Sequence, residues 1–126
     1  MIKWKLTYGK GRFRKMDTGL PVLSLCRKAG LLSIGFDMTK QALAERKAVL
    51  VVLADGISPK TEKEICFWAK KYQVNVFRSA ADIQEISAQI GKKAGVLGIL
   101  NQGLAKSYLN KQPQAALLQA NISSGK

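Results

Sequence analysis

The 126-residue sequence contains no histidine and few cysteines, prolines and acidic residues. Histidine is the commonest general base and a frequent metal ligand, so its absence excludes the usual catalytic triads and most zinc sites. Cys26 and Cys66 lie far apart within apolar helical patterns, outside any Cys-x-x-Cys motif, and we expect two reduced core thiols. No pair of the few carboxylates has a spacing that clearly brings the two groups together on one face. We therefore expect a protein that is not an enzyme, with no metal, cofactor or small-molecule substrate.

Long apolar runs and phosphate-binding loops are also missing. No apolar run approaches the roughly 18 residues of a membrane span, and no signal-peptide core follows the N-terminal charges. The Gly-Lys-Gly at 9–11 lacks the strand and the helix that flank a phosphate loop, and the Gly-Lys-Lys-Ala-Gly at 91–95 lacks a following Lys-Ser or Lys-Thr. These absences favour a cytoplasmic protein without a membrane partner.

Positive charge is what the sequence has in excess. Lys and Arg number 21 against 8 Asp and Glu, which gives a formal net charge of +13. Such an excess favours a polyanionic partner, and RNA, DNA and acidic membrane surfaces are the usual three.

The two ends of the chain differ in composition from its middle. Residues 1–16 carry six cations and no acid, and Trp4, Tyr8 and Phe13 lie among these cations. This segment predicts a basic arm that binds nucleic acid or a solvated tail. A third possibility is that translation starts at Met16, because Asp17 and Thr18 make a natural helix cap. A segment that rests on an anionic membrane is a weaker alternative. Residues 111–126 predict a frayed tail, which leaves one domain over 17–110.

Helices and strands are expected to alternate along this domain. The apolar pattern predicts helices over 19–29, 36–46, 59–72, 80–90 and 102–109, and strands over 31–34, 48–54, 74–77 and 96–100. Helix caps are expected at Asp17 or Thr18, at Ser58 and at Ser79. The strand over 48–54 is apolar throughout and is therefore expected at the centre of the sheet. This order argues for helices on both faces of a small sheet.

Two helices are expected to turn specific apolar residues toward the core. In the helix over 36–46 these are Met38, Ala42 and Leu43. In the helix over 59–72 they are Ile65, Phe67, Trp68, Ala69 and Tyr72.

The entrance of the helix over 36–46 and the loop before the last strand are expected at one end of the sheet. Gly35, Asp37 and Lys40 would then face Lys92, Lys93 and Ala94. Free N–H groups at a helix entrance attract anions, Asp37 would accept hydrogen bonds from base edges, and the lysines would bind phosphates. The alternative for Asp37 is a first-turn acid favoured by the helix dipole, and for Lys92 and Lys93 cations favoured at the end of a helix.

Residues 20–109 resemble the L-seven-Ae / L-thirty-e ribosomal protein superfamily of kink-turn RNA binders, most closely its short bacterial YlxQ-like members. The resemblance runs through LSLCRKAGLLSIG, AVLVVLADGISPKTEKEI, YQVNVF and IGKKAGVLGILNQGLAKSYL, in that order. It implies an α/β fold, a three-layer α/β/α sandwich whose small mixed sheet has helices on both faces. It also implies a protein that binds structured RNA, ribosomal or kink-turn-like, without catalysis, and that associates with the ribosome.

The resemblance also assigns an RNA surface. Gly35 matches the family's Gly, and Asp37 matches its Asn or Asp. Met38 stands in place of the family's Glu, and Gln41 stands in place of its Lys. Lys40 lies one residue before that Lys position and is therefore turned by about 100° around the helix. Residues 92–95 match the loop that closes over an extruded nucleotide. The residues expected to bind RNA are Arg27, Lys28, Gly35, Phe36, Asp37, Met38, Lys40, Gln41, Lys92, Lys93 and Ala94.

These replacements leave a second hypothesis, which is a protein-interaction scaffold. A chain of the same fold that has lost RNA recognition would present an apolar contact surface to a protein partner. That surface would consist of Leu31, Ile34, Phe36 and Met38.

Overall fold

A computed structural model of the chain describes residues 19–112. The predicted basic arm over 1–16 and the tail from 113 onward lie outside the described residues, as do Asp17 and Thr18. The helices are α1 (Leu20–Lys28), α2 (Phe36–Ala44), α3 (Pro59–Lys71), α4 (Ile83–Ile90) and α5 (Gln102–Asn110), and the strands are β1 (Leu32–Ile34), β2 (Leu50–Asp55), β3 (Asn75–Asp82) and β4 (Val96–Ile99).

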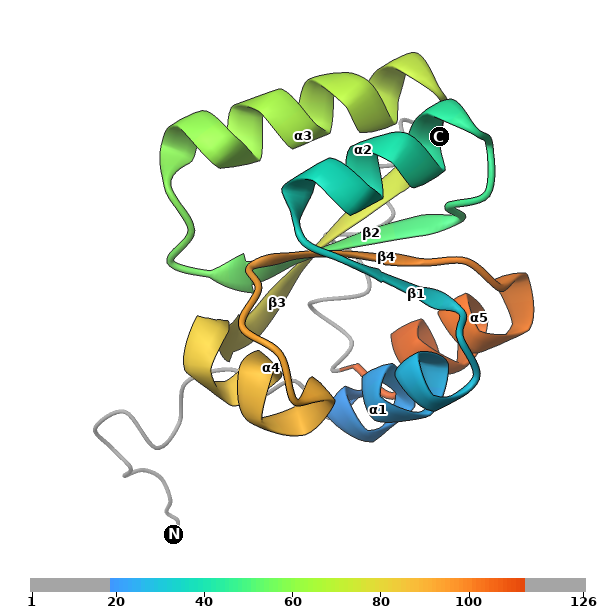
Figure 1. The fold of residues 1–126 in the computed structure, drawn as a ribbon, viewed down its shortest axis with the longest axis vertical. Coiled ribbons are helices and arrows are strands. Elements are labelled where there is room, and N and C mark those ends of the chain that lie inside the picture. Colours follow the sequence, from blue (N-terminus) through green and yellow to red (C-terminus); the bar gives the residue numbers. More distant parts are fainter. Residues whose placement is uncertain (1–18, 113–126) are drawn as a thin grey trace, which may run out of the picture.

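The elements form three layers, with the sheet between two layers of helices. The strand order is β1-β4-β2-β3, in which β2 and β3 run parallel and the other neighbours antiparallel. Helices α2 and α3 cover one face of the sheet, and α1, α4 and α5 cover the other (Figure 1). The predicted three-layer α/β/α sandwich with a mixed sheet is confirmed.

Strand β2 supplies both hydrophobic cores. Leu50, Val52 and Ala54 pack into the core with α1, α4 and α5, whereas Val51 and Leu53 pack into the core with α2 and α3. Because successive side chains of a strand point to opposite faces, a strand between two helical layers has to be apolar at every position. The expectation of a central strand here is confirmed.

The boundary between β3 and α4 differs from the prediction. Ser79 does not cap the helix, because β3 continues to Asp82. The Ser79 hydroxyl instead accepts a hydrogen bond from the Ala81 N–H at 2.9 Å. Asp82 is the cap: it accepts from the Glu85 N–H at 2.8 Å, and Glu85 accepts from the Asp82 N–H at 3.0 Å. This reciprocal capping box satisfies two backbone donors where a serine cap satisfies one.

The cap of α1 also differs. Helix α1 begins after Gly19, which makes no side-chain capping bond. A Cβ at Gly19 would lie 2.7 Å from the Tyr108 ring, so this glycine packs directly against α5.

Two apolar side chains expected in the core are exposed instead. Phe67 is 62% exposed and Met38 is 54% exposed. Two residues advance a helix by about 200°, so Phe67 lies opposite Ile65 and Ala69, the buried residues of α3. The core position on the first turn of α2 belongs to Thr39, which is fully buried.

Thr39 anchors α2 to the sheet through a small polar contact. Its hydroxyl oxygen lies 3.0 Å from the hydroxyl oxygen of Ser33, the middle residue of β1. Ser33 is paired across the ladder with Gly98, and a Cβ at Gly98 would lie 2.4 Å from the Ser33 hydroxyl oxygen. The absence of a side chain at Gly98 therefore lets the first turn of α2 sit close to β1 and β4.

We expect Gly98→Ala to lower the free energy of unfolding by about 1–3 kcal/mol, because the added methyl group overpacks this contact. Urea denaturation followed by circular dichroism measures the loss. Ala88→Ser, a small change on the exposed surface of α4, is the control and should change the free energy of unfolding by no more than about 0.5 kcal/mol. Ser33→Ala in the Gly98→Ala background should recover part of the loss, and an unchanged stability of Gly98→Ala would contradict the assignment.

Candidate nucleic-acid interface

The entrance of α2 is hydrogen-bonded to the start of β4. The Gly35 N–H donates to the Val96 carbonyl oxygen at 2.8 Å, and Ile34 pairs with Leu97 in the antiparallel ladder. The chain after β1 and the chain before β4 therefore lie at the same end of the sheet (Figure 1). The structure brings together the two segments that were expected to face each other.

Gly35 has a backbone conformation that favours glycine. Its φ is +100° and its ψ is 161°, a region in which an L side chain costs about 1–3 kcal/mol. A Cβ at this position would have nothing within 4 Å, so the requirement comes from the backbone angle and not from crowding. No side chain caps α2.

The exposed face of α2 carries one acid in its first turn and a polar network in its last. Asp37 and Met38 are exposed at the entrance, whereas Phe36 is partly buried against the core under α2 and α3. Met38 occupies the position that the resemblance assigns to a glutamate, and it offers no hydrogen-bonding group there.

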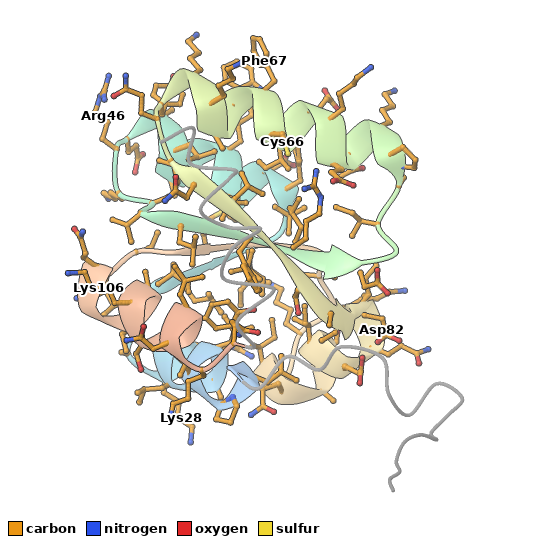
Figure 2. All side chains as sticks on the ribbon, turned by 180° about the vertical axis from the view of Figure 1, so that it is seen from behind. Lys28, Arg46, Cys66, Phe67, Asp82 and Lys106 are labelled. Carbon is orange, nitrogen blue, oxygen red and sulfur yellow. The ribbon has the colours of Figure 1, made fainter. Side chains whose placement is uncertain are left out.

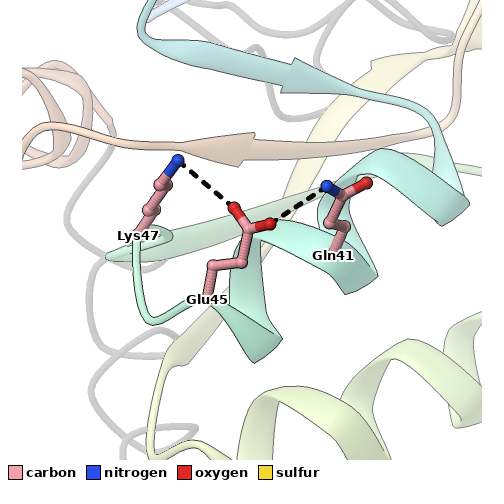
Figure 3. A network of polar contacts seen from close by, with 3 residues as sticks. All are labelled: Gln41, Glu45 and Lys47. Carbon is pink, nitrogen blue, oxygen red and sulfur yellow. Dashed lines mark hydrogen bonds and ion pairs between the residues drawn. The ribbon is translucent and has the colours of Figure 1, made fainter.

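Gln41 stands where the resemblance expects a lysine, and it is bonded to an acid. Its side-chain amide donates to Glu45 at 3.0 Å, and Glu45 also pairs with Lys47 at 3.2 Å (Figure 3). The hydrogen bond from Gln41, followed by the contact with Lys47, holds the pKa of Glu45 below its ordinary value. The carboxylate is therefore charged at neutral pH, and Gln41 offers a neutral amide, already bonded to Glu45, where the resemblance expects a cation.

Lys40 points toward α3. Its ammonium nitrogen lies 4.5 Å from the centroid of the Trp68 ring, which is a cation–π geometry. The expectation that Lys40 faces Lys92 and Lys93 is therefore wrong, because the aromatic ring holds it on the other side of α2.

The loop between α4 and β4 exposes its two lysines and buries its alanine. Gly91 ends α4 in the left-handed conformation, and Lys92 and Lys93 follow it on the surface. Ala94 is only 9% exposed, packs in the core and donates its N–H to the Ser87 hydroxyl at 3.4 Å. The Ala94 side chain thus leaves little surface on which a nucleotide would rest.

Arg27 fixes the start of this loop. Its guanidinium donates a hydrogen bond to the carbonyl oxygen of Ile90, the last residue of α4. A cation at the C-terminal end of a helix also interacts favourably with the helix dipole. The Arg27 guanidinium thus contacts the start of the loop, and the expectation that the exposed Arg27 binds phosphate stays a prediction. Lys28 is exposed at the end of α1, and the length of β1 separates it from Gly35.

Asp55 adds a second carboxylate that the sequence analysis did not include among the site residues. The Ala54 N–H donates to the Gly95 carbonyl oxygen at 2.9 Å, so the exposed end of β2 borders the loop. This proximity follows from the pairing of β2 with β4, which no local sequence signal encodes.

The two thiols are protonated at neutral pH. Burial raises the pKa of Cys26 to about 11 and also raises the pKa of the partly buried Cys66.

Over residues 19–112, no three His, Cys, Asp or Glu side chains come together to hold a metal ion. None of the helices in this range has the length and apolar character needed to cross a bilayer.

Solved structures share this fold. A protein of unknown function from Bacillus halodurans C superposes with a TM-score of 0.69 at 24% identity, covering 82% of this chain and 98% of that chain. The Giardia lamblia 15.5kD RNA binding protein superposes with a TM-score of 0.65 at 11% identity, covering 82% and 84%.

The sequence comparisons agree with the structural ones. The RNA-binding protein YlxQ of Enterococcus faecium is 32% identical over 85 residues, which are 68% of this chain and 82% of that protein. The model of the ribosomal protein L7Ae/L30e/S12e/Gadd45 family matches residues 17–108. The resemblance drawn from residues 20–109 is confirmed, and the chain belongs to the ribosomal protein L7Ae/L30e/S12e/Gadd45 family.

Proposed function

We propose that this protein binds structured RNA that contains a bend or a loop, and that it does so without catalysis. The proposed surface consists of the entrance of α2 at Gly35 and Asp37 together with the exposed lysines of the loop, Lys92 and Lys93. The single observation that carries the proposal is the hydrogen bond from Gly35 to Val96, which joins the two segments into one surface. The relative from Enterococcus faecium, named as an RNA-binding protein, supports the choice of ligand.

The recognition mechanism follows from the chemistry of these groups. Backbone N–H groups at the uncapped entrance of α2 would donate to RNA oxygens, and the Asp37 carboxylate would accept from guanine or amino groups. Lys92 and Lys93 would pair with phosphates on the opposite side of the entrance. A straight duplex displays its base edges and phosphates in a fixed geometry, so a bent RNA with splayed bases fits this surface better. We further propose that the bound RNA contains a kink-turn, that the protein associates with the ribosome, and that it acts in the cytoplasm.

The alternative of a protein-interaction scaffold has less support. Of the four residues expected to form its apolar surface, Leu31, Ile34 and Phe36 are partly buried, and Ile34 and Phe36 pack against the cores. Met38 is 54% exposed, and one side chain gives only a small apolar patch.

A kinked hairpin should bind more tightly than a plain duplex of equal length at about 150 mM salt. Asp37→Ala should weaken binding of the kinked hairpin by about ten- to hundredfold, because a hydrogen bond to a charged group contributes about 1.5–3 kcal/mol. Glu64→Ala removes an exposed carboxylate on α3 and should not weaken it. Fluorescence anisotropy measures all three proteins, and equal affinities for hairpin and duplex would rule out recognition of RNA shape.

The double variant Lys92→Gln/Lys93→Gln should lower the salt dependence of hairpin binding. Each lost phosphate contact reduces the slope of log K against log salt by about 0.7–0.9, so we expect a change of about 1.4–1.8. Lys106→Gln/Lys111→Gln, which removes two exposed lysines at α5, is the control with the same change in net charge. A slope that changes equally in both variants would mean that net charge, and not the loop, binds the RNA.

A further inference from the structure

Phe67 is an exposed aromatic ring surrounded by lysines. It projects from the outer side of α3 and is 62% exposed (Figure 2). Residues three and four positions away are its neighbours on the helix surface, and these are three lysines and one acid, Lys63, Glu64, Lys70 and Lys71. An apolar ring at such a position lacks the protein contacts that usually cover a phenylalanine.

The neighbouring rings on α3 already attract cations. The Phe67 and Trp68 rings meet edge to face with centroids 5.4 Å apart. Lys40 lies 4.5 Å and Lys71 lies 5.1 Å from the centroid of the Trp68 ring. Arg46 lies 5.6 Å from the centroid of the Tyr72 ring. We call this set of residues the α3 surface: Lys40, Arg46, Lys63, Phe67, Trp68, Lys70, Lys71 and Tyr72.

The α3 surface is positively charged because most nearby acids are paired elsewhere. Glu62 forms an ion pair with Arg78, and Glu45 forms one with Lys47. Within the described part of α3, Glu64 is the one acid for which no ion pair is found. The cations of the α3 surface therefore outnumber the acids that would compensate them.

We propose that the α3 surface is a second RNA-binding site, which takes a single-stranded segment. An unpaired base would stack on Phe67, and Lys63, Lys70 and Lys71 would bind the phosphates that flank it. This combination of an exposed aromatic ring and surrounding lysines is sequence-tolerant, because every base has a π face. The inference rests on the proposed function only for the class of ligand.

A protein partner fits this surface less well. The core of a protein interface is depleted of charge and spreads over several apolar side chains. The exposed large apolar residues found over 19–112 are Leu25, Met38 and Phe67, and they lie on three different helices. A single ring among lysines instead provides what one stacked nucleotide needs.

The α3 surface and the entrance of α2 would bind different parts of an RNA. Helix α3 forms one edge of the molecule, and the loop before β4 runs from α4 on the other side of the sheet (Figure 1). A structured hairpin at the α2 entrance would therefore leave its single-stranded flank to reach α3.

The test is binding of a short, fluorescein-labelled oligouridine to Phe67→Ser, with Leu25→Ser as the matched control. Stacking on an aromatic ring contributes about 1–3 kcal/mol per base, so Phe67→Ser should bind about tenfold more weakly or worse. Leu25→Ser removes an apolar side chain with 53% exposure from α1 and should bind as the unmodified protein does. Thermal unfolding should be the same for all three, because both side chains are exposed. Equal oligouridine affinity for Phe67→Ser and the unmodified protein would overturn the inference.

Tryptophan fluorescence gives a second readout. The chain has two tryptophans, so Trp4→Phe leaves Trp68 as the one reporter, beside Phe67. Oligouridine should change its emission with the same Kd as the anisotropy gives, and an emission that does not change at saturation would overturn the inference. If Phe67→Ser instead abolishes self-association in sedimentation and leaves oligouridine binding intact, the surface contacts a second copy and the inference is wrong.

The same variants separate this inference from the proposed function. Asp37→Ala should weaken binding of the kinked hairpin and leave oligouridine binding unchanged. If Asp37→Ala affects neither ligand while Phe67→Ser weakens oligouridine binding, the proposed function fails and the α3 site stands. The reverse pattern removes the α3 site alone.

Discussion

The antiparallel pairing of β1 with β4 is the constraint on which the rest of this structure depends. It places Gly35 beside Val96, and the hydrogen bond between them fixes the α2 entrance against the loop that carries Lys92 and Lys93. The pairing is short, and the contact among Ser33, Thr39 and Gly98 reinforces it from the helix side. The α2 entrance is therefore positioned by the sheet, and Gly35 at its cap places no side chain there.

The structure divides the cations of this basic chain by what they contact. Arg27 is bonded to the end of α4, and Lys40 lies over Trp68, so both contribute to internal geometry. Lys92 and Lys93 are exposed beside the α2 entrance, whereas Lys70 is exposed on α3. A net charge of +13 favours a polyanionic partner in general. The positions of the exposed cations are the reason for proposing two separate RNA-binding surfaces, one at the α2 entrance and one on α3.

The fold was predictable because its signals are local or periodic. The uninterrupted apolar run of β2 required cover on both faces, and the alternation of helices and strands predicted the layers. The Asp82 cap was missed because serine and aspartate are both good caps, and the choice between Ser79 and Asp82 depends on how far β3 pairs with β2. Phe67 was misplaced because apolar character alone does not separate a core position from an exposed one on the opposite side of the same helix.

The candidate site was predictable in part. The proximity of the α2 entrance to the loop was expected, whereas the antiparallel pairing of β1 with β4 that produces it was not predicted. The roles of Arg27, Ala94 and Asp55 were not predicted either, because they depend on contacts between α1, α4 and β2 that are distant in sequence. Likewise, an exposed lysine and a lysine over an aromatic ring look the same in the sequence, as Lys93 and Lys40 show.

The most direct test of the central claim is a titration of the 15N-labelled protein with a kinked RNA hairpin, followed by amide chemical shifts. The account predicts that the amides of Gly35, Asp37, Lys92 and Lys93 shift together, with one common Kd, while those of α5 do not move. Shifts confined to one of the two segments, or to residues away from both, would contradict a joint RNA-binding surface.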